Sequence, residues 1–209
     1  MLPVYTKLPQ DHHFDYAYLM HVLRSYRSPR DKVTQMLSRG EILRIKKGLY
    51  VRSPDFGGHV HTNEIANALY GPSYISLEYV LSLHALIPER VVEITSVTSK
   101  RNKFFQTPVG AFSYHHIRQK VFSVGVHLVE NESGRYFTAT KEKALCDKVA
   151  FASNMRTISE LREYIYDDLR IEPEELGRLD LNELSGIRNT YGSNRIDLLY
   201  RLVSGLNKR

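Results

Sequence analysis

The sequence predicts an α+β protein with a helical N-terminal unit, a mixed α/β domain that holds a small, mainly antiparallel sheet, and a helical C-terminal region. Apolar residues recur at helical spacing in the first forty residues and again from Thr140 onward. Between them lie three strand-like runs, at 91–99, 111–117 and 121–129. A content of 42% hydrophobic and 25% charged residues over 209 positions is typical of a folded globular protein.

Two helices are expected first. Residues 14–24 place Phe14, Leu19 and Val22 at the spacing of an amphipathic helix. A second helix begins after Ser28, which is a favourable N-cap, with Pro29 at the first helical position. Gly40 ends it. A third helix must come either from residues before Phe14 or from 61–71.

The second helix has two different faces. Val33, Met36 and Leu37 form one apolar stripe. The opposite face carries hydroxyl and amide side chains flanked by cations, which suits hydrogen bonding. Its members are Thr34, Gln35 and Ser38, with Lys32 and Arg39 beside them.

A hairpin follows, because apolar and polar residues alternate on both sides of Lys47-Gly48. Arg44 and Lys46 are expected to share one face of its first strand. Helix, turn, polar-faced helix and basic hairpin is the order of a winged helix-turn-helix, whose second helix enters the major groove of DNA. We predict this domain at 1–56, a hinge with a connecting helix at 57–72, and the α+β domain at 73–209, with the hinge centred on 53–60.

Further helices are expected at 62–70, capped by Thr62 or Asn63, and at 76–86, capped by Ser76. From Thr140 the pattern is almost wholly helical. Residues 158–183 carry nine acidic residues against three arginines. We expect a solvated face there, with contact to a basic partner as the alternative.

The positive charge is concentrated in one short region. Between Arg24 and Arg52, nine Lys or Arg face two acidic residues, a net charge of 9 − 2 = +7, while the whole chain carries +6. Such a local excess indicates a polyanionic partner, and a solubilising surface is the alternative. If six cations neutralise phosphates, a plot of the logarithm of the binding constant against the logarithm of the salt concentration should have a slope of roughly −5. The predicted DNA-binding residues are Arg30, Lys32, Thr34, Gln35, Ser38, Arg39, Arg44, Lys46 and Lys47.

Within this set, Thr34, Gln35 and Ser38 are predicted to read bases, since glutamine contacts adenine bidentately and hydroxyls donate or accept. Arg30 lies near the apolar edge of its helix, so an internal ion pair is its alternative role. A second basic run, Lys100, Arg101 and Lys103, is expected in an exposed loop that contacts DNA or a partner.

Catalytic and metal-binding motifs are not evident. The histidines at 59, 61, 84, 115 and 116 form no compact ligand motif, and neighbours on a strand point to opposite faces, so we expect neither metal nor cofactor. Glu93 with Lys100 and Lys103 is the nearest approach to a nuclease centre, but a second acid is missing. Lone Cys146 excludes an internal disulfide and is expected to be a buried thiol. With no signal-peptide pattern and no apolar run of ~20 residues, a cytoplasmic protein is expected.

Residues 71–117 and 139–149 contain PSYISLE, LIPE, TSVTSKR, TPVG, FSYHHI and T-x-EKAL-x-D. In combination they resemble the AbiEi family of antitoxins from type IV toxin-antitoxin (abortive infection) systems, as does the N-terminal SPRDKVTQMLSRGEILRIKKGLY. The resemblance spans roughly residues 14–150. It implies a winged-helix domain that represses its own operon and a C-terminal domain that counteracts a nucleotidyltransferase toxin, with or without a stable complex.

We therefore expect a non-enzymatic DNA-binding autorepressor and antitoxin. Its partners would be double-stranded operator DNA with inverted repeats, bound by a homodimer or by cooperating monomers, and the toxin. One alternative is a nuclease or nucleotide-processing enzyme that grips nucleic acid with the basic region. Another is an antitoxin that binds only protein.

Overall fold

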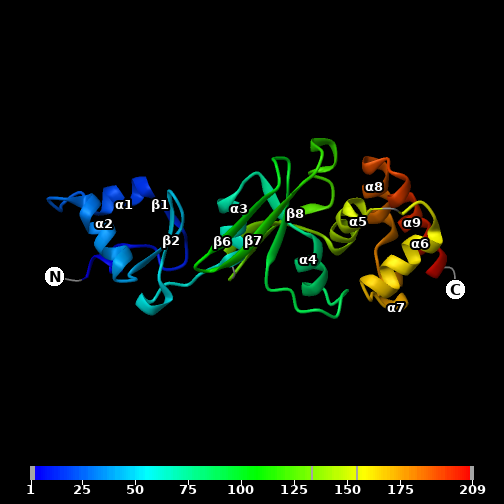
Figure 1. The fold of residues 1–209 in the computed structure, drawn as a ribbon, viewed down its shortest axis with the longest axis horizontal. Helices are drawn as coiled ribbons and strands as arrows, with labels where there is room; N and C mark the ends of the chain where they lie inside the picture. Colours follow the sequence, from blue (N-terminus) through cyan, green and yellow to red (C-terminus); the bar gives the residue numbers. More distant parts are fainter. Residues whose placement is uncertain (1–2, 133, 154, 208–209) are drawn as a thin grey trace.

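The structure, a computed structural model, describes residues 3–132, 134–153 and 155–207. It is a mixed α/β protein with two sheets, which agrees with the expected α+β class. Figure 1 shows an elongated molecule in which an N-terminal unit, a central sheet region and a helical C-terminal region follow one another along the long axis. The two termini lie at opposite ends of that axis.

The N-terminal unit has a small core of its own, formed by residues such as Leu19, Val33 and Met36. Its three strands pair antiparallel in the order β1-β3-β2. A 3₁₀ turn, η1, supplies Val4 to the same core, so the segment before Phe14, not 61–71, completes this unit. The elements are η1 (Val4–Lys7), β1 (Phe14–Asp15), α1 (Tyr16–Val22), α2 (Pro29–Ser38), β2 (Ile42–Lys46) and β3 (Leu49–Arg52).

Helix α2 has the expected ends. Ser28 occupies the N-cap position and Pro29 the first turn, although the Ser28 hydroxyl hydrogen-bonds the Asp31 carboxylate and not a backbone amide. At the other end Gly40 takes a φ of +68°, and the Glu41 amide donates to the Met36 carbonyl at 2.9 Å. This pairing closes the last turn and satisfies carbonyls that the helix leaves free.

Helix α1 begins two residues later than expected. Phe14 pairs with Tyr50 as part of strand β1. The Asp15 carboxylate accepts a hydrogen bond from the Tyr18 amide at 2.7 Å, which caps the helix. A good N-cap therefore outweighs the apolar periodicity that placed Phe14 inside the helix.

The hairpin turns at Lys47-Gly48 as expected, with Gly48 at φ +88°. The regular alternation expected for its first strand is wrong, because the pairing register shifts between Arg44 and Lys46. Strand β3 is buried along its whole length. Tyr50 packs in the small core, whereas Leu49 and Val51 pack in the large core of the rest of the chain.

The central sheet has the strand order β6-β7-β5-β4-β9-β8. Pairs β5–β7 and β4–β9 are parallel, and the other three pairings among the described residues are antiparallel, so the sheet is mixed and larger than expected. The last expected strand starts five residues late, because Gln119–Val121 is a 3₁₀ turn, η3. The strands are β4 (Ser73–Ile75), β5 (Ile94–Thr98), β6 (Lys103–Thr107), β7 (Gly110–His116), β8 (Val126–Asn131) and β9 (Gly134–Ala139).

Helix α3 (Thr62–Leu69) precedes β4, and helix α4 (Leu77–Leu83) follows it. The expected caps differ. His61 occupies the N-cap position of α3 and makes no side-chain cap. Ser76 precedes α4 as expected, but its hydroxyl donates to Asp147 at 2.8 Å.

The C-terminal region is helical, as expected from Thr140 onward. Thr140 caps the first helix by accepting a hydrogen bond from the Lys143 amide, and Thr157 with Glu160 forms a capping box. The elements are α5 (Lys141–Phe151), α6 (Ile158–Glu163), the π-helical turn η4 (Tyr164–Asp168), α7 (Pro173–Gly177), α8 (Leu181–Tyr191) and α9 (Asn194–Leu206).

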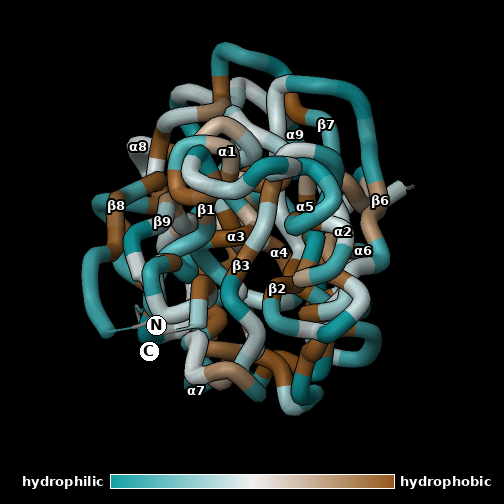
Figure 2. Tube along the Cα trace, turned by 90° about the vertical axis from the view of Figure 1, so that its left-hand side faces the viewer, coloured by the Kyte–Doolittle hydropathy of each residue, from teal (hydrophilic) through white to brown (hydrophobic). Residues whose placement is uncertain are grey.

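Hydrophobic segments gather inside the molecule. In the end-on view of Figure 2, hydrophobic stretches near α3 and α4 lie centrally and hydrophilic loops lie at the periphery.

None of the helices within 3–132, 134–153 and 155–207 has both the length and the apolar character needed to cross a bilayer.

Candidate nucleic-acid interface

Helix α2 presents an exposed polar face. Thr34, Gln35 and Ser38 are exposed, while Val33 and Met36 on the other side are buried in the small core. Burying one side of a two-faced helix leaves its polar side turned to solvent. The residues predicted to read bases therefore lie together on one exposed helical surface.

Hydrogen bonds within α2 determine which donors and acceptors on this face remain for an external partner. Lys32 Nζ donates to Gln35 Oε1 at 2.9 Å, which leaves the Gln35 amide nitrogen free to donate outward. Thr34 Oγ1 donates to the Arg30 carbonyl at 3.3 Å and Ser38 Oγ to the Gln35 carbonyl at 2.9 Å. Both hydroxyls keep lone pairs that can accept hydrogen bonds.

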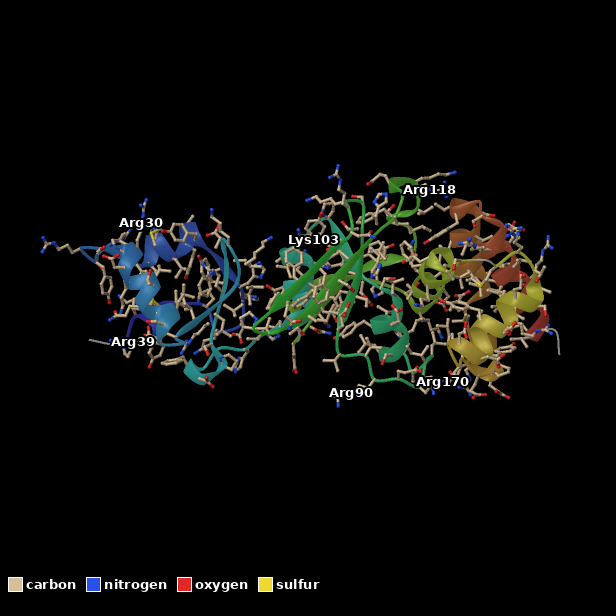
Figure 3. The ribbon with its side chains drawn as sticks, in the orientation of Figure 1. Arg30, Arg39, Arg90, Lys103, Arg118 and Arg170 are labelled. Atoms are coloured by element: carbon tan, nitrogen blue, oxygen red, sulfur yellow. The ribbon has the colours of Figure 1, made fainter. Side chains whose placement is uncertain are left out.

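Cations frame the helix. Arg30 and Arg39 are exposed and lie at the N-terminal and C-terminal ends of α2, at the outer end of the molecule (Figure 3). Arg39 approaches the Glu41 carboxylate at 3.8 Å, and its side chain is 58% exposed. The Glu41 side chain is only 10% exposed, but the contact is long, and the Arg39 guanidinium lies largely in solvent where an external phosphate can reach it.

Lys46 is engaged elsewhere. Its ammonium donates to the carbonyls of Leu69 at 2.5 Å and Ala68 at 3.4 Å, at the C-terminal end of α3. Burial lowers the pKa of Lys46, and the nearby charge of Lys100 lowers it further. This cation stabilises the contact between the hairpin and α3, so it does not join the α2 face.

The second basic run is also separate from α2. Lys100 donates to the Gly71 carbonyl and lies over the Tyr70 ring, while Arg101 is exposed. Lys103 begins strand β6 and lies toward the middle of the molecule, away from Arg30 and Arg39 (Figure 3).

A hollow of about 770 Å³ lies between the hairpin and the β6–β7 turn. Arg44 and Lys47, both exposed, contribute cations to its wall. The sequence did not indicate that Tyr16, Gln106 and Pro108 would join them, because only the packing of the two units brings these segments together.

The nuclease-like constellation is not assembled. Glu93 immediately precedes β5 and Lys100 follows it, so the strand, roughly 17 Å long at ~3.3 Å per residue, separates them. Within the described residues no three His, Cys, Asp or Glu side chains are placed to hold a metal ion. Cys146 is buried, and burial raises the pKa of its thiol.

A buried polar cluster was missed at the sequence level. Lys143 and Asp147, both fully buried, form an ion pair at 2.9 Å on successive turns of α5. Burial lowers the pKa of Lys143, although Asp147 opposes this shift, and burial raises that of Tyr74. The spacing of four residues in T-x-EKAL-x-D was the available signal. The remaining members bond Asp147 through the hydroxyls of Tyr74 (3.0 Å), Ser76 (2.8 Å) and Tyr191.

Histidines join the N-terminal unit to α3. His13 Nδ1 lies 2.7 Å and His12 Nδ1 3.4 Å from the carboxylate of Glu64, in the first turn of α3. His59 Nδ1 lies 2.6 Å from Asp11 Oδ1.

In the expected hinge, a Cβ on Gly58 would lie 2.2 Å from the Arg52 carbonyl oxygen, so this close approach requires glycine.

No family model matches the chain, and no curated protein matches it. The resemblance to AbiEi antitoxins stays a prediction that depends on the motifs alone.

Proposed function

We propose that this protein is a non-enzymatic DNA-binding autorepressor and antitoxin of the AbiEi type. The observation that supports DNA binding best is the exposed face of α2, where Thr34, Gln35 and Ser38 lie between the cations Arg30 and Arg39. A rigid helix that combines hydrogen-bonding side chains with flanking cations suits the major groove of a duplex.

The N-terminal unit is proposed to be a winged helix-turn-helix. In support, α1 and α2 are followed by the β2–β3 hairpin, and the three strands form a compact antiparallel sheet beside the helices. In this arrangement α2 reads bases and the hairpin tip with Lys47 contacts the phosphate backbone.

The antitoxin role depends on the second domain. The T-x-EKAL-x-D motif that carries the resemblance contains Lys143 and Asp147, whose cluster ties α5 to β4 and α8. The motif therefore has a structural reason to accompany this fold. A nucleotidyltransferase toxin is the proposed functional partner, and a homodimer on inverted repeats is the proposed DNA-bound form.

The test is a gel-shift titration on the protein's own promoter at two salt concentrations. Gln35→Ala should relax base preference at one position and cost about 1–3 kcal/mol there. Lys47→Ala should weaken binding to all duplexes alike and reduce the salt slope by about 0.9. Gln119→Ala and Lys120→Ala, exposed positions in the second domain, are the matched controls.

Equal and weak binding of the unmodified protein to every duplex would contradict the repressor proposal. The protein-binding antitoxin would then be the better account.

An enzyme is the alternative function. In that case Glu93→Ala should abolish turnover on nucleic acid and leave operator binding intact. The separation of Glu93 from Lys100 along β5 argues against it. Nuclease activity that disappears in Glu93→Ala would establish the enzyme instead.

A further inference from the structure

The hollow between the hairpin and the β6–β7 turn combines exposed cations with an exposed aromatic ring. Arg44 and Lys47 line it from the hairpin, and Tyr16, 38% exposed, lines it from α1. Gln106 lines it from β6. Two structural units thus build one polar hollow, which the face of α2 does not include.

A further aromatic residue, Phe104, does not line the hollow itself but precedes Gln106 by two residues on β6. Side chains two residues apart on a strand share a face, so Phe104 lies on the same face of β6 as Gln106. Phe104 is 56% exposed. Its ring is therefore available to an external planar group.

We propose that this hollow binds a single strand of nucleic acid, with phosphates on Arg44 and Lys47 and bases stacked on Tyr16 and Phe104. Cations that follow the backbone together with aromatic side chains that stack bases are the recurring elements of single-strand sites. This activity goes beyond the proposed reading of duplex DNA by α2.

The size of the hollow favours a single strand over a duplex. About 770 Å³ is the volume of a small-molecule cleft. A duplex, whose major groove alone is ~12 Å wide, cannot enter such a space, and its stacked bases would not reach Phe104. A single strand can turn its unstacked bases toward the rings.

Strand β6 has a further property that suits this role. It stands at the edge of the central sheet, since β7 is its only sheet neighbour in the described part of the chain. Edge strands keep backbone N–H and C=O groups free on one side. These groups can hydrogen-bond sugars or base edges without disturbing the sheet.

The test measures fluorescence anisotropy of a labelled 12-nucleotide single strand of mixed sequence, titrated with the full chain. Phe104→Ala should weaken binding about tenfold, the loss typical of one base-aromatic stack. Leu83→Ala, which removes another large exposed apolar side chain, should leave it unchanged. Neutralising Arg44 and Lys47 together should reduce the salt slope by about 1.4, at ~0.7 per phosphate.

Two further measurements separate this proposal from the proposed repressor. Gln35→Ala should leave single-strand binding unchanged, and Phe104→Ala should leave operator binding unchanged. Failure of the unmodified protein to recognise its operator, with single-strand binding retained, would overturn only the repressor. Equal effects of Phe104→Ala and Leu83→Ala, or an acidic peptide that displaces the oligonucleotide at equal concentration, would overturn the single-strand site.

Discussion

Cations near helix α2 in the N-terminal unit are exposed to solvent, whereas a cation in helix α5 of the C-terminal region is buried and bound by protein groups. At the two ends of α2, Arg30 and Arg39 are exposed to solvent at the outer end of the N-terminal unit. In α5, Lys143 is fully enclosed, and its ammonium is bound by Asp147, the Val121 carbonyl at 2.8 Å and the Tyr191 hydroxyl at 2.7 Å. Local sequence alone would class all three as basic positions on helices.

The difference shows that a cation can bind an external anion only where the fold leaves it exposed and does not already pair it with protein groups. An enclosed ammonium has lost its water, so removing its partner leaves an uncompensated charge. An exposed guanidinium keeps its water and loses little when a phosphate replaces it. Net charge therefore overstates the binding surface wherever a cation is already bound inside the fold.

The largest expected effect comes from the enclosed cluster. Asp147→Ala leaves the Lys143 ammonium and the hydroxyls of Tyr74, Ser76 and Tyr191 without their shared acceptor. Removing one partner of a buried ion pair costs about 3–5 kcal/mol of the free energy of unfolding. Urea denaturation followed by circular dichroism measures it.

An exposed pair is the control. Glu175→Ala breaks the ion pair with Arg178, whose side chain is 69% exposed, and should cost no more than about 1 kcal/mol. Similar losses in Asp147→Ala and Glu175→Ala would remove the distinction between enclosed and exposed charge.

An intermediate effect is expected at the end of α2. Gly40 has a φ of +68°, and a Cβ there would meet no atom within 4 Å, so Gly40→Ala is penalised only by backbone strain. That strain is about 1–2 kcal/mol for a left-handed residue. Thermal unfolding should show the loss.

The matched change is Gly186→Ala inside α8, where a Cβ also meets no atom within 4 Å and the backbone is helical. It should stabilise by about 0.5–1 kcal/mol, because alanine favours helices. If both glycine substitutions change stability in the same direction, backbone strain at Gly40 is not the cause.

The smallest expected effect depends on pH. Burial by itself raises the pKa of Glu78, but the hydrogen bond and charge of Lys148, a backbone hydrogen bond and the nearby His115 together outweigh burial and hold the pKa below its usual value. A lowered folded pKa contributes stability above pH 4.5 that disappears as pH falls through the folded value. Glu78→Gln should cost less than about 1 kcal/mol at pH 7, because the pair is partly exposed.

Denaturation curves between pH 3 and pH 7 check this prediction. The stability difference between wild type and Glu78→Gln should be flat above pH 5 and shrink as the pH falls below that. A difference that grows on acidification would contradict it.

Much of the N-terminal unit could be predicted from sequence, because local signals determine it. Ser28, Pro29 and Gly40 set the ends of α2, and Gly48 set the hairpin turn. The start of α1 was placed too early, because Asp15 caps the helix and the preceding Phe14 pairs with the distant Tyr50 in β1.

The central sheet was harder to predict. Strands β4, β6 and β9 were missed because they are short or carry exposed polar residues, and their partners are distant in sequence. The candidate site shows the same division. The exposed face of α2 followed from helical periodicity, whereas the engagement of Lys46 with α3 and the part of Gln106 in the hollow depend on packing between the units.

Strand β3 belongs to both cores, with Tyr50 on one side and Leu49 and Val51 on the other. If the chain were cut at residues 53–57, Leu49 and Val51 in the N-terminal fragment would lose the residues of the large core that bury them. An N-terminal fragment ending there should self-associate, while one extended through Leu69 should be better behaved. A recombination event that transfers the N-terminal unit to another protein is therefore expected to give a stable product most often when α3 is transferred with it.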